Sequence, residues 1–178
     1  MDAPTTSEAV SSAAPSARSM LTIYLHDHYA GSCAGVALVG RIAARHAGTE
    51  LAADLRWLAA QIRQDQASLR AIMERLGIHP VAYKNALAMA GERLSRLKPN
   101  GRLFRSSPLS TVVELQSMQI AVYGKRCGWQ DLRALADNLP ALDADELDGL
   151  IRRADEQISR LEDMRETSVV RVLGGRRS

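Results

Sequence analysis

The chain has 178 residues, of which 46% are hydrophobic and only 4% aromatic. This length suffices for one domain with its own core, and the scarcity of aromatic, alternating segments excludes a predominantly β-sheet protein. The formal net charge is +3, from 23 Lys and Arg against 20 Asp and Glu. So small an excess is not that of a nucleic-acid-binding groove. The composition therefore predicts an all-α fold without a nucleic-acid partner.

The two ends of the chain differ in composition from its middle. Residues 1–19 are rich in Ser, Ala, Pro and Thr, with neither the basic start nor the apolar run of a secretion signal. No segment has the run of about 20 apolar residues that a membrane span needs. We therefore expect a cytoplasmic protein with no membrane partner. Its predicted organisation is a disordered tail over 1–19, a helical bundle over 20–166 and a C-terminal tail over 167–178.

The first two predicted helices each show one apolar or small face. Residues on this face recur at steps of four and three along the chain, which is the spacing of an α-helix. We expect Gly48 to end the first helix, Thr49 to cap the second and Gly77 to end it. The short turn predicts an antiparallel hairpin. The positions are 21, 25, 28, 32, 35, 39, 42 and 46 in the first helix, and 51, 55, 58, 62, 65, 69, 72 and 76 in the second.

A second hairpin follows a long connection. His79 and Pro80 predict the start of a short helix that ends near Leu97. Pro108 predicts a third long helix that reaches about residue 132, and a fourth follows the loop 138–143. A connection of about thirty residues between the second and third long helices exceeds the usual two to eight, and can cross from one end of a bundle to the other. The third helix carries the apolar residues Val112, Val113, Leu115, Met118, Ile120 and Val122, and the fourth has Leu147, Ile151, Ala154, Ile158 and Leu161 at steps of four and three.

Two short stretches resemble a known superfamily. Tyr24–His28 and Asn100–Leu103 are similar to stretches of uncharacterised bacterial ferritin-like domains, over roughly residues 21–165. The resemblance implies a ferritin-like four-helix bundle, up-down-down-up, whose long crossover between the second and third long helices contains a short helix. It implies this fold more than any activity.

The sequence lacks the standard ferritin-like metal motif. A di-iron site of that kind uses a Glu from each of two helices and a Glu-x-x-His pair from each of the other two. The residues three positions before the four histidines are Ile23, Leu25, Ala43 and Leu76. The nearest counterparts of the pair are Asp65 with Ser68 and Ala154 with Gln157. We therefore expect no di-iron centre and no other cofactor.

His28 and Asp65 interrupt the apolar faces of the first two helices. Counted from Gly48, their depths in the bundle differ by about 4 to 5 Å at 1.5 Å per residue, so we expect them to meet. One interpretation is a hydrogen-bonded core pair, because a buried aspartate needs a partner. A second is an atypical iron or manganese site formed with Glu114. The third is that one of the two faces solvent.

Small residues form stripes on the first and third long helices. Such stripes let helix backbones approach closely, although a pocket for an apolar ligand is the alternative. The stripes are Gly31, Ser32, Ala34 and Gly35 on the first helix, and Ser117, Ala121, Gly124 and Gly128, following Glu114, on the third.

These observations predict a non-catalytic ferritin-like bundle that acts in interaction or assembly. We expect it to form a homo-oligomer, and a further protein partner is compatible with the sequence. The alternative is a metal-dependent oxidase or metal-storage protein whose site is built on His28, Asp65 and Glu114.

Overall fold

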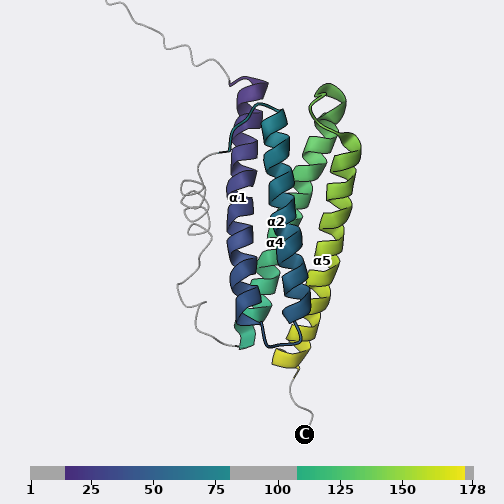
Figure 1. Ribbon diagram of the computed structural model, residues 1–178. Coiled ribbons are helices and arrows are strands. Elements are labelled where there is room, and N and C mark those ends of the chain that lie inside the picture. Colours follow the sequence, from purple (N-terminus) through teal and green to yellow (C-terminus); the bar gives the residue numbers. More distant parts are fainter. Residues whose placement is uncertain (1–14, 81–107, 175–178) are drawn as a thin grey trace, which may run out of the picture.

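The computed structural model describes residues 15–80 and 108–174, which form a bundle of four α-helices (Figure 1). The helices are α1 (Ala17–Arg45), α2 (Ala52–Arg75), α4 (Pro108–Leu135) and α5 (Ala144–Leu173), with a short 3-10 helix, η1 (Ala136–Asn138), after α4. The described residues contain no strand. The predicted all-α, four-helix architecture is therefore confirmed for this part of the chain. The short helix expected in the connection after Pro80 lies outside the described residues.

Contacts at the two ends of the bundle show the direction of each helix. α1 is antiparallel to α4, because residues near its start contact the end of α4 and its last residue contacts the start of α4. α2 is antiparallel to α5 by the same criterion. Since α1–α2 and α4–α5 are hairpins, α2 and α4 run in the same direction (Figure 1). The contacts are Tyr24 with Asp131, Arg45 with Glu114, Arg75 with Glu146, and Arg171 with Glu50.

The turn between α1 and α2 differs in detail from the expectation. α1 begins at Ala17, after Ser16, whose hydroxyl accepts a hydrogen bond from the Ser19 N–H at 3.1 Å. It ends at Arg45, three residues before Gly48. The prediction that Thr49 caps α2 is wrong, because Leu51 occupies the cap position and the Thr49 hydroxyl instead donates to the His46 carbonyl at 3.0 Å.

The predicted end of α2 at Gly77 is confirmed. Gly77 has φ of 68°, a conformation that residues with a Cβ rarely adopt. Its N–H donates to the Glu74 carbonyl, and the Ile78 N–H donates to the Met73 carbonyl at 2.8 Å. This is the Schellman arrangement, in which a left-handed residue closes the helix and the following apolar side chain packs back on it. Ile78 is buried accordingly.

The last helix is longer than expected. Asp143 caps α5 by accepting hydrogen bonds from the N–H groups of Asp145 and Glu146. α5 continues past Glu166, where we expected the bundle to end, and stops at Leu173. Ser168 is buried and its hydroxyl donates to the Met164 carbonyl at 2.7 Å. Residues 167–173 are thus helical, and only residues 175–178 of the expected C-terminal tail lie outside the described part.

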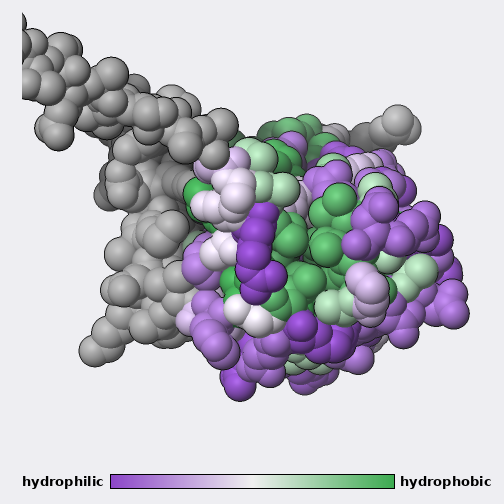
Figure 2. Space-filling view, turned by 90° about the horizontal axis from the view of Figure 1, so that it is seen from above, coloured by the Kyte–Doolittle hydropathy of each residue, from purple (hydrophilic) through white to green (hydrophobic). Residues whose placement is uncertain are grey.

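The core consists of the apolar faces of all four helices. Viewed from above, hydrophobic residues gather in the middle of the bundle and hydrophilic ones around it (Figure 2). Full burial of one such side chain stabilises the fold by about 1.5 to 3 kcal/mol. None of the described helices combines the length and apolar content of a membrane span. Fully buried members are Leu25, Val39 and Ile42 of α1, Leu55, Leu58 and Ile72 of α2, Leu115 of α4, and Leu147, Ala154 and Leu161 of α5.

Candidate functional site

Asp65 of α2 is the centre of a buried polar cluster. Its side chain is only 2% exposed. It accepts hydrogen bonds from Arg153 Nε at 2.6 Å and from Gln157 Nε2 at 2.8 Å, and it forms an ion pair with Lys125. Lys125 also donates to Gln157 Oε1. One carboxylate therefore joins α2 to α4 and α5. These four residues are called the Asp65 cluster below.

The Asp65 cluster holds one negative and two positive charges. Burial lowers the pKa of the Lys125 ammonium, and the neighbouring Asp65 carboxylate opposes that shift. Lys125 and Arg153 keep 19% and 22% of their side-chain surface exposed, so both cations retain some hydration. An unpaired charge in such a place costs several kcal/mol. The mutual pairing is what makes burial of Asp65 tolerable.

His28 is not the partner of Asp65, so the expected hydrogen-bonded pair is wrong. The side-chain hydrogen bonds and ion pairs of Asp65 within the described residues go to α4 and α5, whereas His28 packs against α4. The His28 ring lies 4.4 Å from the Tyr24 ring, centroid to centroid. A Cβ added at Gly128 would come within 2.9 Å of its Cε1 atom. Burial lowers the pKa of His28, which favours the neutral imidazole, and Asp131 partly opposes the shift.

Tyr24 and Asp131 fasten α1 to α4 beside His28. The Tyr24 hydroxyl donates to Asp131 Oδ2 at 2.5 Å. Burial, together with this hydrogen bond, raises the pKa of Tyr24 above its ordinary value, so the phenol stays protonated and keeps donating. Glycine at position 128 leaves the room that the His28 ring occupies. The His28 ring therefore packs closely against α4 at Gly128.

Glu114 lies at the other end of the α1–α4 interface. It forms an ion pair with Arg45, and its Oε2 atom is buried without a hydrogen-bond partner in the described part of the chain. His28 packs on residue 128 of α4, fourteen residues beyond Glu114, which corresponds to about 21 Å along a helix. Residues 15–80 and 108–174 hold no group of three or more His, Cys, Asp or Glu side chains suited to a metal ion. The structure therefore does not assemble the atypical site of His28, Asp65 and Glu114.

A cavity of about 330 Å³ lies between α1, α2 and α4, and its lining reaches Tyr24, His28 and Gly128 at one end of the α1–α4 interface. Three other glycines of the small-residue stripes line it, and a Cβ added at Gly31, Gly35 or Gly124 would meet no atom within 4 Å. The expected close backbone approach does not occur at these glycines, because neither helix offers a side chain that fills the space. The stripes leave a hollow instead.

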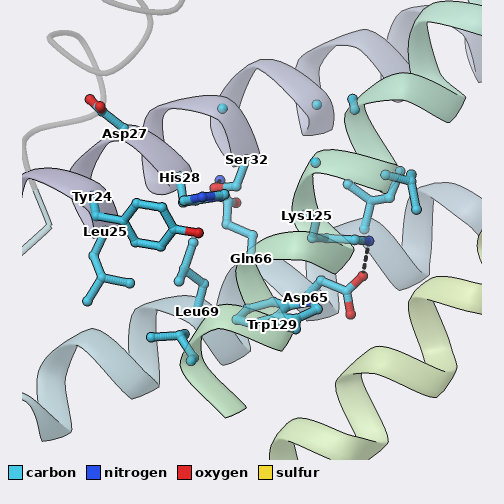
Figure 3. A pocket seen from close by; sticks show the side chains of 18 of the residues that line it. Tyr24, Leu25, Asp27, His28, Ser32, Asp65, Gln66, Leu69, Lys125 and Trp129 are labelled. Carbon is cyan, nitrogen blue, oxygen red and sulfur yellow. Dashed lines mark hydrogen bonds and ion pairs between the residues drawn. The ribbon is translucent and has the colours of Figure 1, made fainter. Parts of the chain in front are cut away.

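The cavity has polar side chains at both ends and an apolar wall between them. In Figure 3, Lys125 and Asp65 lie at one end, while Tyr24, Asp27 and His28 lie at the other. Gln66 lies between them and donates to Ser32 Oγ at 3.2 Å and to Cys33 Sγ at 3.3 Å. The apolar wall consists of Leu25, Ile62, Leu69, Met118, Val122, Trp129 and Leu132.

α4 also carries apolar residues on its outward face. Ile120 is 73% exposed, and Tyr123 is 49% exposed. Cys127 is exposed as well, whereas Cys33 is buried. Residues 113, 116, 120, 123 and 127 recur at alternating steps of three and four, which is the spacing of a coiled-coil seam. This strip is called the outer seam of α4.

Sequence reasoning missed the cations that surround Asp65. Lys125 had a signal, because it continues the steps of three and four that run through Met118, Val122 and Trp129, all buried. Gln157 had a similar signal, because it lies three residues after Ala154 and four before Leu161, and it is fully buried. Arg153 belongs to a polar stretch of α5 and had none.

Comparison of the chain with models of known families, with curated proteins and with solved structures gives no match. The resemblance to ferritin-like domains thus remains a prediction.

Proposed function

We propose that the protein is a non-catalytic, ferritin-like helical bundle that acts by assembly with a second copy of itself. The outer seam of α4 is the observation that carries this proposal. The order of helix directions supports the fold assignment, since two hairpins joined by one long crossover make an up-down-down-up bundle. That is the arrangement of ferritin-like proteins.

The Asp65 cluster supports the non-catalytic part of the proposal. Ferritin-like di-iron proteins place carboxylates and imidazoles on the inward faces of the bundle. Here the inward carboxylate of Asp65 is already paired with two cations, Lys125 and Arg153. A divalent metal brought to this place would meet a net positive charge, which disfavours its binding.

The outer seam supports self-assembly. Its alternating steps of three and four would let the strip face another helix along several turns. Ile120 and Tyr123 project from α4, whereas the exposed side chain of Cys127 in the same strip is short and leaves low surface. A symmetric contact brings the same patch together from both subunits, so a strip with both projecting and low parts can complement itself. Gln116 is a polar seam position of the kind that sets helix register.

The assembly proposal is tested by measuring the mass in solution with light scattering. We expect the native chain to be a dimer or a larger closed oligomer, and Ile120→Glu to shift it to monomer without loss of helix content. Val170→Glu is the matched control, because Val170 of α5 is 71% exposed but lies outside the seam. A monomeric native protein, or an unchanged mass for Ile120→Glu, would contradict the proposal.

The non-catalytic part has a separate test. We expect protein prepared in medium containing iron and manganese to hold far less than one metal ion per chain by elemental analysis. Two irons per chain, together with iron oxidation that is lost in His28→Ala, would overturn it.

A further inference from the structure

We propose that the cavity between α1, α2 and α4 binds a small amphipathic monocarboxylate. The apolar body would lie among the aliphatic side chains of the wall, and the carboxylate would meet Lys125. This inference goes beyond the assembly proposal and does not depend on it, because it uses the interior of one subunit.

The size and walls of the cavity suit a molecule of modest length. Its volume of about 330 Å³ is at the lower end of the range of ligand pockets, which is about 300 to 1,000 Å³. Leu25, Leu69 and Leu132 line it together with Trp129. Such surface is favourable for an alkyl or aryl group, because its burial removes apolar area from water. The wall therefore selects an apolar body rather than a sugar or a nucleotide.

Lys125 provides the recognition of the head group. A lysine ammonium has three N–H donors. Two of them reach Asp65 Oδ2 and Gln157 Oε1, so one remains for an acceptor inside the cavity that Lys125 lines. The unused group of Lys125 is a donor, which calls for a ligand that accepts hydrogen bonds.

The charge balance distinguishes an anion from the other head groups. Asp27 also lines the cavity, but it lies at the end far from Lys125 (Figure 3). At the Lys125 end, Asp65 carries one negative charge, and Lys125 and Arg153, which both pair with Asp65, carry two positive charges. One carboxylate would bring this group to neutrality. An alcohol would satisfy the donor without balancing the charge, and an ammonium would add a third positive charge. We therefore expect the order carboxylate, alcohol, ammonium.

The cavity has an opening to solvent between α1 and α4. Gly31, Ala121 and Gly124 line the cavity and are exposed, so the low side chains of both helices form its mouth. Gln66 is held by Ser32 and Cys33, which fixes one side of the interior. A ligand can enter at this mouth without separation of the helices.

The experiment is calorimetric titration of the full chain with octanoate, 1-octanol and octylammonium, which share one alkyl chain. We expect saturable binding of one octanoate per chain, about tenfold or more tighter than octanol, which is the effect of one charge-assisted hydrogen bond. Octylammonium should show no saturable binding. Absence of saturable octanoate binding at millimolar concentration, or equal binding of octanol, would overturn the proposal.

Two variants locate the site. Lys125→Met should lower octanoate affinity to that of octanol, and thermal unfolding would show that the variant is folded. Gly35→Leu should abolish binding by filling the cavity. Gly40→Leu is its matched control on α1, since a Cβ at Gly40 also meets no atom within 4 Å and Gly40 is not a lining residue. Unchanged octanoate binding by Gly35→Leu would place the site elsewhere and overturn the proposal. The mass of each variant in solution, measured in parallel, keeps this result separate from that of the assembly test.

Discussion

The Asp65 cluster and the α1–α4 cavity are two interior regions of one bundle with opposite packing. Around Asp65, the long side chains of Lys125, Arg153 and Gln157 reach inward from α4 and α5 and fill the space. Along the cavity, Gly31 and Gly35 of α1 and Gly124 of α4 leave open space, since a Cβ added at any of them would meet no atom within 4 Å. The comparison shows that a polar or small residue on an apolar helix face does not by itself decide the packing around it. The space there is filled only where a neighbouring helix has a side chain long enough to occupy it.

This difference suggests that the Asp65 cluster serves the stability of the fold and the cavity serves binding. The Asp65 cluster joins three helices through charges that must stay paired. Substitutions in it should therefore lower the free energy of unfolding strongly. The cavity has unused space and one unused lysine donor. Substitutions of its glycines should therefore change the free energy of unfolding little, or even raise it. The following variants test that contrast, from the largest expected effect to the smallest.

Asp65→Asn should have the largest effect. It keeps the size of the side chain but leaves Lys125 and Arg153 without their counter-charge. We expect the free energy of unfolding to fall by about 3 kcal/mol, the low end of the range for a broken buried pair, because both cations keep about a fifth of their surface exposed. Urea unfolding would measure this.

Glu74→Gln is the control for Asp65→Asn. Glu74 pairs with Arg70 on the surface of α2, where the side chains are 50% and 64% exposed. Its loss should cost about 0.5 kcal/mol or less. Equal effects of the two variants would mean that the Asp65 cluster contributes no more than a surface pair.

Gly128→Ala should destabilise the fold by about 1 to 2 kcal/mol. The new Cβ would lie 2.9 Å from His28 Cε1, so the ring would have to move from its place against Tyr24. Thermal unfolding would show the loss. A neutral or stabilising result would mean that the His28 ring is free to move aside, and that this end of the interface is as loose as its middle.

The His28 ring should also make stability depend on pH. Burial lowers its pKa below the ordinary 6.5, and burial likewise lowers that of His46. As the pH falls, these histidines therefore bind protons at a higher pH in the unfolded chain than in the folded one. The free energy of unfolding should decrease as the pH falls below about 6.5. One such group contributes a slope of at most about 1.4 kcal/mol per pH unit.

His28→Phe isolates this contribution. It retains a ring but cannot titrate, so urea unfolding between pH 7 and pH 5 should show a smaller slope than in the native chain. His28→Phe combined with His46→Phe should flatten the slope further. A slope that is unchanged by both substitutions would show that other groups cause the acid sensitivity.

Gly124→Ala should have a smaller effect than Gly128→Ala, and of opposite sign. The added methyl group would lie in open space. Alanine is the better helix former, so we expect a gain of about 0.5 to 1 kcal/mol. A loss on thermal unfolding would mean that the interface is closed at this position and that the cavity is narrower than described.

The periodicity of the sequence determined the helices and their inward faces. Steps of three and four placed Leu25, Leu55 and Leu161 in the core, and Gly77 predicted the end of α2. These features are local, because they depend on spacing within one helix and on the conformation of one residue. The periodicity did not decide two other features. Ile120 continues an apolar stretch of α4 but points outward, and α5 extends past the last residue of the predicted bundle.

Only the tertiary structure decided the partners of the polar residues. Spacing along a helix places a residue at a depth and on a face, but it does not say which of three neighbouring helices lies opposite. Thus His28 and Asp65 were expected at similar depths, yet His28 packs against α4 and Asp65 bonds to α4 and α5. Long side chains add a second uncertainty, since Lys125 and Arg153 reach Asp65 from two other helices. The cavity arises in the same way, because a stripe of glycines becomes a contact or a hollow only when the opposite helix is in place.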